Sequence, residues 1–215
     1  MNKCEIYQTV LGIVGTNVYL LKNKETSEAV IIDPADDAPA ILKLCDKADA
    51  VPCAILLTHG HFDHTMAAEE LAKDLDLPIY AYSGENALMR DPWANGSASL
   101  AGLQATCTAD REVTEGQMLR LAGFRIKVLH TPGHTSGSCC YYLPDEGILV
   151  SGDTLFRGSY GRTDLETGSD AAIFRSVRRL LKELPEDTKV LPGHMGSTTI
   201  AFEKKYNPLS ETAAW

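Results

Sequence analysis

Metal-ligating side chains are concentrated in one short segment, residues 58–64, which reads Thr-His-Gly-His-Phe-Asp-His. The segment follows an apolar run over residues 53–57 that is typical of a buried strand. His59 and His61 are two positions apart, so on an extended backbone their rings point to the same side and can bind one ion. Asp63 and His64 follow where the chain turns toward a helix, and they can face a neighbouring ion. The segment therefore predicts a metal site.

Three further candidates, His134, Asp153 and His194, occur at comparable positions later in the chain. Each follows a predicted strand and a glycine, and glycine at such corners permits unusual backbone angles and close approach. We therefore expect seven side chains from separate strand ends to converge on one edge of the fold. They are His59, His61, Asp63, His64, His134, Asp153 and His194.

Five of the six histidines belong to this pattern. An isolated histidine is more often a hydrogen-bonded core or surface residue than a ligand, but five histidines and two aspartates at strand ends are not expected by accident. The sixth, His130, precedes the turn that leads to His134, and we expect it to have a structural or supporting role. The density of the motif thus favours metal binding.

The ligand types indicate which ions and which chemistry to expect. Histidine and carboxylate ligands without thiolate suit two divalent metal ions, with Zn²⁺ expected first and iron or manganese as alternatives. Two ions about 3.5–4 Å apart can share a water, lower its pKa toward neutrality and polarise a carbonyl. Asp63 is expected to orient the resulting hydroxide. No serine or cysteine nucleophile is then required.

Several neighbouring residues allow two interpretations. Asp33 can support a metal-bound imidazole, or it can simply form a turn. Arg162 can bind a substrate carboxylate, or it can pair with Asp164 across a loop. Tyr160 and Trp93 can line the substrate pocket, or they can pack as ordinary aromatic side chains. We take Arg162 and Tyr160 as the candidate substrate-binding residues.

The sequence resembles the metallo-β-lactamase fold superfamily, whose signature H-x-H-x-D-H is present at residues 59–64. The resemblance implies that His134 joins His59 and His61 on a first metal. It also implies that His194 joins Asp63 and His64 on a second metal, and that Asp153 bridges the two and takes part in catalysis. It extends from Thr16 through Asp33 to His194, which is nearly the whole chain.

Residues 152–156, 158–165 and 203–208 make the sequence similar to small, single-domain glyoxalase II-like hydrolases. This resemblance implies hydrolysis of a small thioester by a metal-bridging hydroxide, as in hydroxyacylglutathione hydrolases. Full-length glyoxalase II enzymes have a further C-terminal helical domain that helps bind glutathione, and we expect the chain to lack it. Where those enzymes have a lysine and a tyrosine that contact glutathione, this sequence has Arg162 and Asp164, which leaves the thiol open.

Three other functions remain as alternatives. A mononuclear iron persulfide dioxygenase of the same fold also has a Gly-Arg-Thr-Asp stretch like residues 161–164. A lactone or ester hydrolase would use the same ligands as a thioesterase. A metal-bound module without catalysis is the third, and it is the least expected because every hydrolytic ligand is present.

The surrounding pattern predicts an α/β fold that positions these residues. Strands are expected in two groups, over residues 6–32 and 118–151, with further strands at 53–57, 79–82 and 189–191. Helices are expected over 39–45, 65–75, 197–205 and from an N-cap at Ser169. Because each sheet needs both faces covered, we predict an αββα sandwich of two mixed β-sheets flanked by helices. Residues 83–107 are expected to form a substrate-side loop.

Composition narrows the range of partners and locations. With 215 residues, 44% hydrophobic and 23% charged, the chain is expected to form a single domain over residues 1–215. A formal charge of −9 predicts no nucleic-acid and no membrane partner, although a local basic patch remains open. We expect a small thioester or ester substrate as the partner, and a monomer or small homo-oligomer.

The N-terminal sequence and the cysteines indicate the cellular compartment in which we expect the protein. The N-terminus has no basic start, apolar core or cleavage site, so no secretory signal is expected. Six cysteines without a C-x-x-C pair are typical of reduced thiols in a cytoplasmic protein. Neither an exported β-lactamase nor a nuclease with an added clamping domain is expected from this sequence.

Overall fold

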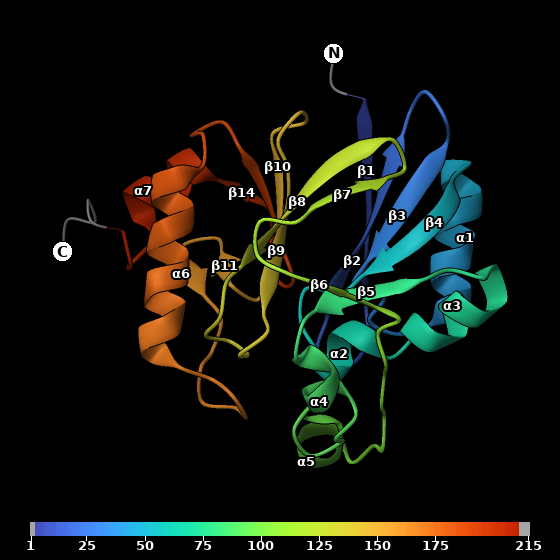
Figure 1. Cartoon of the computed structure of the whole chain (residues 1–215), viewed down its shortest axis with the longest axis horizontal. Coiled ribbons are helices and arrows are strands. Elements are labelled where there is room, and N and C mark those ends of the chain that lie inside the picture. Colours follow the sequence, from blue (N-terminus) through green and yellow to red (C-terminus); the bar gives the residue numbers. More distant parts are fainter. Residues whose placement is uncertain (1–2, 211–215) are drawn as a thin grey trace.

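The computed structural model describes residues 3–210 and consists of two β-sheets packed face to face with helices outside them (Figure 1). The first sheet is mixed, because β1 to β3 are antiparallel and β3 to β6 are parallel. Its strands, in spatial order, are β1 (Cys4–Leu11), β2 (Thr16–Asn23), β3 (Glu28–Ile32), β4 (Val51–Leu56), β5 (Ile79–Tyr82) and β6 (Arg111–Val113).

The second sheet is also mixed, since only the pair β10 and β13 is parallel. Its strands, in spatial order, are β14 (Thr198–Thr199), β13 (Lys189–Pro192), β10 (Ile148–Gly152), β9 (Cys139–Leu143), β8 (Phe124–His130) and β7 (Met118–Leu121). A short antiparallel ribbon, β11 (Leu155–Phe156) and β12 (Ser159–Tyr160), follows β10.

Helices cover both outer faces of the sandwich (Figure 1). The helices α1 and α3 lie on the outer side of the first sheet, and α6 and α7 lie on the outer side of the second. Three short helices, α2, α4 and α5, gather at one end (Figure 1). The bounds are α1 (Ala38–Ala48), α2 (Phe62–Thr65), α3 (Ala68–Leu75), α4 (Glu85–Met89), α5 (Ser97–Ala101), α6 (Asp170–Glu183) and α7 (Ile200–Tyr206). The predicted αββα sandwich is therefore confirmed.

Three layers of apolar side chains hold the sheets and helices together. The middle layer lies between the sheets and includes Tyr19, Phe124 and Tyr141, all at most 2% exposed. The adjacent Cys139 and Cys140 show the alternation of a strand, because the first packs in this middle layer and the second packs under α6. Burial of each large apolar side chain contributes about 1.5–3 kcal/mol to folding.

The structure departs from the predicted elements in four places. The helix expected over residues 65–75 begins earlier, at Phe62, and is divided into α2 and α3. Residues 83–107, expected to be a loop, contain the two five-residue helices α4 and α5. The short strands β6, β11, β12 and β14 were not predicted, and the last helix begins at Ile200 instead of residue 197. The elements that were not predicted contain only two to five residues each.

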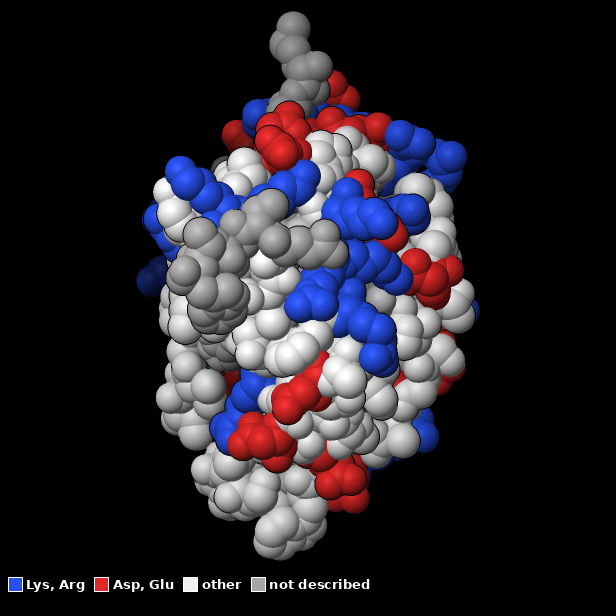
Figure 2. Space-filling view, turned by 90° about the vertical axis from the view of Figure 1, so that its left-hand side faces the viewer, with Lys and Arg blue, Asp and Glu red and all other residues white. Residues whose placement is uncertain are grey.

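The negative net charge is unevenly distributed over the surface. Figure 2 shows lysine and arginine side chains gathered on the face over α6 and α7. The α6 sequence contributes Arg175, Arg178, Arg179 and Lys182. This is a local basic patch of the kind that the sequence left open. Among the described residues, no helix has both the length and the apolar character needed to cross a bilayer.

Candidate metal centre

The seven predicted ligands converge at one end of the sandwich, because they follow the carboxyl ends of strands from both sheets. His59 and His61 follow β4, and Asp63 and His64 lie in α2. His134 follows β8, Asp153 follows β10 and His194 follows β13. Since β10 and β13 run parallel, the residues that leave them emerge at the same edge. We call these seven side chains the His/Asp cluster.

The ligand atoms of the cluster are close enough to surround metal ions. Three sets of three residues have ligand atoms within 4.8 Å of one another. The sets are His59, His61 and His134; His59, His64 and Asp153; and Asp63, His64 and His194. The first and last match the two groups that the sequence resemblance implies.

Asp153 lies between these groups. Its Oδ2 is 3.5 Å from His134 Nε2 and 3.4 Å from His194 Nε2, and its Oδ1 is 3.4 Å from His64 Nε2. One carboxylate thus reaches imidazoles from both groups. This position is suitable for a side chain that contacts two cations.

Hydrogen bonds on the outer side fix the orientation of three imidazoles. His64 Nδ1 is 3.0 Å from Asp33 Oδ2 and His134 Nδ1 is 2.7 Å from the carbonyl of Arg162; both oxygens can only accept, so both nitrogens donate. His59 Nδ1 lies 3.1 Å from Thr58 Oγ1. With Nδ1 engaged in this way, the lone pair of Nε2 is directed at the cluster, as metal binding requires.

The donor atoms have the character of a metal site. Within the described residues, the Nε2 atoms of His59, His61 and His64 and the Oδ1 atom of Asp153 are buried without a hydrogen-bond partner. Burying such groups unpaired costs about 1–3 kcal/mol each, so several together need a common partner. Divalent cations can satisfy those of these atoms that face the cluster, and His61 faces it with Nδ1, 2.9 Å from His134 Nε2. Mixed imidazole and carboxylate ligands suit zinc, iron or manganese. The residues therefore fit a bound divalent metal.

The members of the cluster also shift one another's pKa values. Burial and neighbouring imidazoles hold the pKa of His59 well below its usual range, and burial lowers the pKa of His61 to about 3. Burial acts in the same direction on His64, but the carboxylates of Asp63, Asp153 and Asp33 outweigh it and raise its pKa to about 9. Likewise Asp153 and Asp63 overcome the burial of His194 and raise its pKa to about 10.

Asp33 combines the two roles that the sequence left open. Its backbone has a left-handed conformation, with φ of 48°, as in a tight turn. Its carboxylate accepts hydrogen bonds of 2.7 Å from both the backbone N–H and the hydroxyl of Thr58 as well as the bond from His64. Asp33 therefore fixes both the strand end and an imidazole of the cluster.

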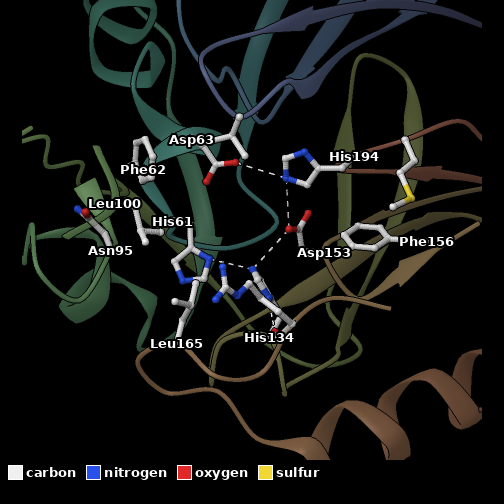
Figure 3. A pocket seen from close by; sticks show the side chains of 13 residues that line it. His61, Phe62, Asp63, Asn95, Leu100, His134, Asp153, Phe156, Leu165 and His194 are labelled. Atoms are coloured by element: carbon white, nitrogen blue, oxygen red, sulfur yellow. Dashed lines mark hydrogen bonds and ion pairs between the residues drawn. The ribbon is translucent and has the colours of Figure 1, made fainter. Parts of the chain in front are cut away.

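A pocket of about 390 Å³ opens directly onto the cluster (Figure 3). Figure 3 shows His61, Asp63, His134, Asp153 and His194 converging on it from several segments. The remaining lining residues are mainly apolar: Val14, Phe62, Asn95, Leu100, Phe156, Arg162, Leu165 and Met195. Asn95 and Leu100 come from the 83–107 region, so part of that region borders the pocket.

The other predicted residues are only partly at the pocket. Arg162 lines it but makes a bidentate ion pair with Asp164, with both N–H to O distances at 2.7 Å. Tyr160 packs edge to face on Phe174, with ring centroids 5.6 Å apart, and neither it nor Trp93 is among the lining residues. His130 is outside the cluster, where it stacks on Tyr82 at 4.1 Å.

Glu85, at the start of α4, supports the cluster and was missed by sequence reasoning. Its carboxylate is fully buried and accepts hydrogen bonds from the backbone N–H of Gly60 at 2.9 Å and from Thr135 Oγ1 at 2.6 Å. Gly60 lies between His59 and His61, and Thr135 follows His134. Glu85 therefore joins the two segments that provide the first ligand group. Burial raises the pKa of its carboxyl group.

At two positions near Asp153 there is too little space for any residue other than glycine. A Cβ atom on Gly193 would overlap Asp153 Oδ1, and one on Gly152 would overlap Thr58 Oγ1. Gly152 also has a left-handed φ of 47°. These contacts explain why glycine directly precedes both Asp153 and His194.

Comparison with known proteins identifies a shared family. A model of the metallo-beta-lactamase superfamily matches residues 11–194. The chain is 38% identical over 200 residues to an uncharacterized protein of Aquifex aeolicus, covering 93% of this chain and 94% of that one. It is 36% identical to the probable metallo-hydrolase YqgX of Bacillus subtilis (92% and 93% covered). It is 32% identical to the hydroxyacylglutathione hydrolase GloC of Haemophilus influenzae (86% and 88%).

Solved structures show the same fold at similar identity. The BLEG-1 B3 metallo-beta-lactamase superposes with a TM-score of 0.91 at 40% identity, covering 96% of this chain and 100% of that one. The di-iron-bound form of TTHA1623 gives 0.81 at 39% identity (94% and 98% covered). ETHE1 from Myxococcus xanthus gives 0.78 at 29% identity (95% and 83%).

We predict that Asp153→Asn weakens metal binding at both ligand groups by more than about tenfold, because a neutral amide cannot attract two cations as a carboxylate does. Metal content after dialysis, with competition titration against a chelator, measures the effect. His194→Ala is the matched comparison and should chiefly affect the group of Asp63 and His64. Unchanged metal content and affinity in Asp153→Asn would show that Asp153 does not serve both groups.

A second prediction concerns Glu85. Glu85→Ala leaves the donors at Gly60 and Thr135 unpaired and should weaken metal binding by His59, His61 and His134 by roughly 10–100-fold. Glu85→Gln retains an acceptor oxygen and should have a smaller effect. The titration is made in a His194→Ala background, so that the first ligand group dominates. Equal affinities for the alanine variant and its parent would contradict the assignment.

A third prediction follows from the raised pKa values of His64 and His194. Both imidazoles carry protons at pH 7 in the metal-free chain, whereas a metal binds only the neutral form. Binding of the metal ions should therefore release about two protons at pH 7. The apparent affinity should rise with pH until the pH exceeds both pKa values, about 9 for His64 and about 10 for His194. Calorimetric titrations in buffers of different ionisation enthalpy measure this release. A value near zero at pH 7 contradicts the prediction.

Proposed function

The chain belongs to the metallo-β-lactamase superfamily, and from this premise we propose that it is a binuclear metal-dependent hydrolase of small thioesters. The single observation that carries the proposal is the His/Asp cluster, with ligand groups on both sides of Asp153 and a pocket open to it. We assign His59, His61 and His134 to one ion, Asp63, His64 and His194 to the other, and Asp153 to both, with Zn²⁺ as the proposed metal.

The thioester substrate is proposed from similarity to one curated relative. GloC, which is 32% identical, is named a hydroxyacylglutathione hydrolase. In the proposed reaction the oxygen of water forms a bond to the acyl carbon, the carbon–sulfur bond breaks, and the proton from water goes to the departing thiolate. When bound, divalent ions lower the pKa of water toward neutrality and polarise the acyl carbonyl.

The chain's own residues position the water in this scheme. Asp63 lines the pocket, and Thr16 donates a 2.7 Å hydrogen bond to its Oδ2. Within the described residues Oδ1 makes no hydrogen bond, so it can accept a hydrogen bond from a water in the pocket and orient it toward the acyl carbon. Burial acts to raise the pKa of Asp63, but the neighbouring imidazoles of His64 and His194 outweigh burial and hold this pKa well below its usual range. The carboxylate of Asp63 is therefore ionised.

Cysteine chemistry is a poor alternative for the nucleophile. Burial raises the pKa of Cys107 to about 12 and that of Cys140 to about 11, and it holds that of Cys139 well above its usual range. Such thiols are inert at neutral pH because the thiolate is the nucleophile. Six free cysteines also support a reducing, cytoplasmic location for the protein.

Two other reactions remain as alternatives. BLEG-1, at 40% identity, is named a B3 metallo-beta-lactamase, so β-lactam hydrolysis is a second candidate. TTHA1623, at 39% identity, was solved in a di-iron-bound form, which keeps iron open as the metal. The mononuclear iron persulfide dioxygenase remains the redox alternative because of the Gly-Arg-Thr-Asp stretch at residues 161–164. The two ligand groups around Asp153 favour a binuclear hydrolase over a mononuclear oxygenase.

The test is turnover by metal-loaded protein. We expect hydrolysis of S-lactoylglutathione or of simpler acyl thioesters, loss of activity after chelation, and recovery on adding Zn²⁺. Elemental analysis should give two metal ions per chain. Asp153→Asn serves as the control for metal-dependent turnover.

The outcomes separate the three reactions. Cleavage of a penicillin or cephalosporin without thioester turnover would favour the second candidate. One iron per chain with oxygen uptake on a persulfide would replace hydrolysis by the redox reaction.

A further inference from the structure

Exposed apolar side chains surround the mouth of the pocket. Val14, Leu100 and Met195 line it, although 50%, 56% and 62% of these residues are exposed. They come from three separate segments: the β1–β2 turn, α5 and the segment after β13. Because exposed apolar residues gathered around a pocket mark a binding surface, this arrangement bears on what the pocket accepts.

The β1–β2 turn displays apolar residues where polar ones are usual. Gly12 and Gly15 have left-handed φ angles of 72° and 76° and enclose Ile13 and Val14. Turns favour Gly, Asn, Asp and Ser, because these residues adopt the angles or bind the local backbone. Ile13 is nevertheless 78% exposed beside Val14. The turn needs neither side chain for its own geometry.

Met195 keeps a long apolar side chain exposed in a strained conformation. Its φ is 66°, in the left-handed region that bulky residues rarely adopt. Asn17 Nδ2 donates a 2.9 Å hydrogen bond to its carbonyl and so helps to hold it directly after His194. Strain of this kind persists at functional sites when the surroundings enforce it.

The polar residues of the pocket outside the cluster are already engaged. Arg162 is bound by both carboxylate oxygens of Asp164. Asn95 donates from Nδ2 to the carbonyls of Met89 and Ala105, and its Oδ1 accepts from Ser97. Each polar side chain that lines the pocket outside the cluster therefore already has a partner within the protein.

Apolar side chains also flank both sides of the cluster. Figure 3 places Phe62, Leu100 and Leu165 on the side of His61, and Phe156 on the side of His194. The ring of Phe156 lies edge to face with that of His194, with centroids 6.0 Å apart. A substrate whose scissile bond lies over the cluster would thus meet apolar surface in both directions.

We propose that the substrate is uncharged and apolar on both sides of the scissile bond, such as an acyl thioester with alkyl groups on the acyl and thiol sides. This inference rests on the proposed thioester hydrolysis. It makes Val14, Leu100 and Met195 the specificity-determining residues, and it disfavours anionic thiol conjugates.

The experiment uses two series of thioesters with metal-loaded protein. In the first, the acyl group of S-acyl-N-acetylcysteamine grows from acetyl to hexanoyl; in the second, the thiol of an S-alkyl thioacetate grows from ethyl to hexyl. We expect kcat/KM to rise by roughly twofold to fourfold per methylene in both series, up to the value for full burial of a CH₂ group. S-Lactoylglutathione should be a poorer substrate than the hexanoyl ester.

Shape-conserving polar variants identify the residues responsible. The triple variant Val14→Thr, Leu100→Asn and Met195→Gln should reduce the ratio of hexanoyl to acetyl kcat/KM by at least about tenfold. This ratio cancels any general loss of activity. Val51→Thr is the matched control, because Val51 is 62% exposed at the amino end of β4 and outside the pocket lining. It should leave the ratio unchanged.

The outcomes distinguish this inference from the proposed function. Turnover that is independent of chain length in either series overturns the inference and leaves thioester hydrolysis standing. Absence of turnover on every thioester overturns the proposed function. In that case, the binding of carboxylates of increasing chain length tests whether the pocket is apolar. Calorimetric titration of acetate, butyrate and hexanoate into metal-loaded protein should show tighter binding with length, and equal affinities overturn the apolar pocket.

Discussion

The constraint on which the site depends is the mutual burial of electron-pair donors. Five imidazoles and two carboxylates are brought together at one end of the sandwich, and several of their atoms are buried without a hydrogen-bond partner within the described residues. Protonation reduces the cost of this burial only in part, because His64 and His194 gain protons while His59 and His61 are held neutral. A bound divalent cation would pair with imidazole and carboxylate donors alike, so metal binding would also stabilise this end of the fold.

Burying the metal-ligating side chains together is unfavourable without a metal. Polar groups outside the sheets hold these side chains in place. Asp33 fixes His64 directly and His59 through Thr58, and the carbonyl of Arg162 fixes His134. Glu85 joins the segments that contain Gly60 and Thr135. The apolar layers between and outside the sheets contain none of these residues. The sheets therefore provide a stable support, and the geometry of the cluster is determined by polar contacts at its edge.

Local signals made most of the fold and the cluster predictable from sequence. The long strands and α6 have clear apolar periodicity, and residues 59–64 contain their ligands within six positions. Five-residue helices such as α4 have too few turns for a periodic pattern. Glu85 was missed because its partners are 25 and 50 residues away, at Gly60 and Thr135, and no spacing rule joins such distant positions.

The same reasoning explains why substrate recognition is harder to predict than catalysis. An aromatic residue beside a glycine is consistent with a pocket wall or with packing, and for Tyr160 a contact with distant Phe174 decides for packing. The residues at the mouth of the pocket lie on a turn, a short helix and a strained position after β13, where substitution disturbs no strand. Asn17 stabilises the last of these, since its side chain binds the carbonyls of Pro192 and Met195 together. Buried hydrogen bonds hold the metal-ligating side chains at the strand ends. The residues around the mouth of the pocket can instead be substituted without loss of the core. One metal site can therefore serve different substrates.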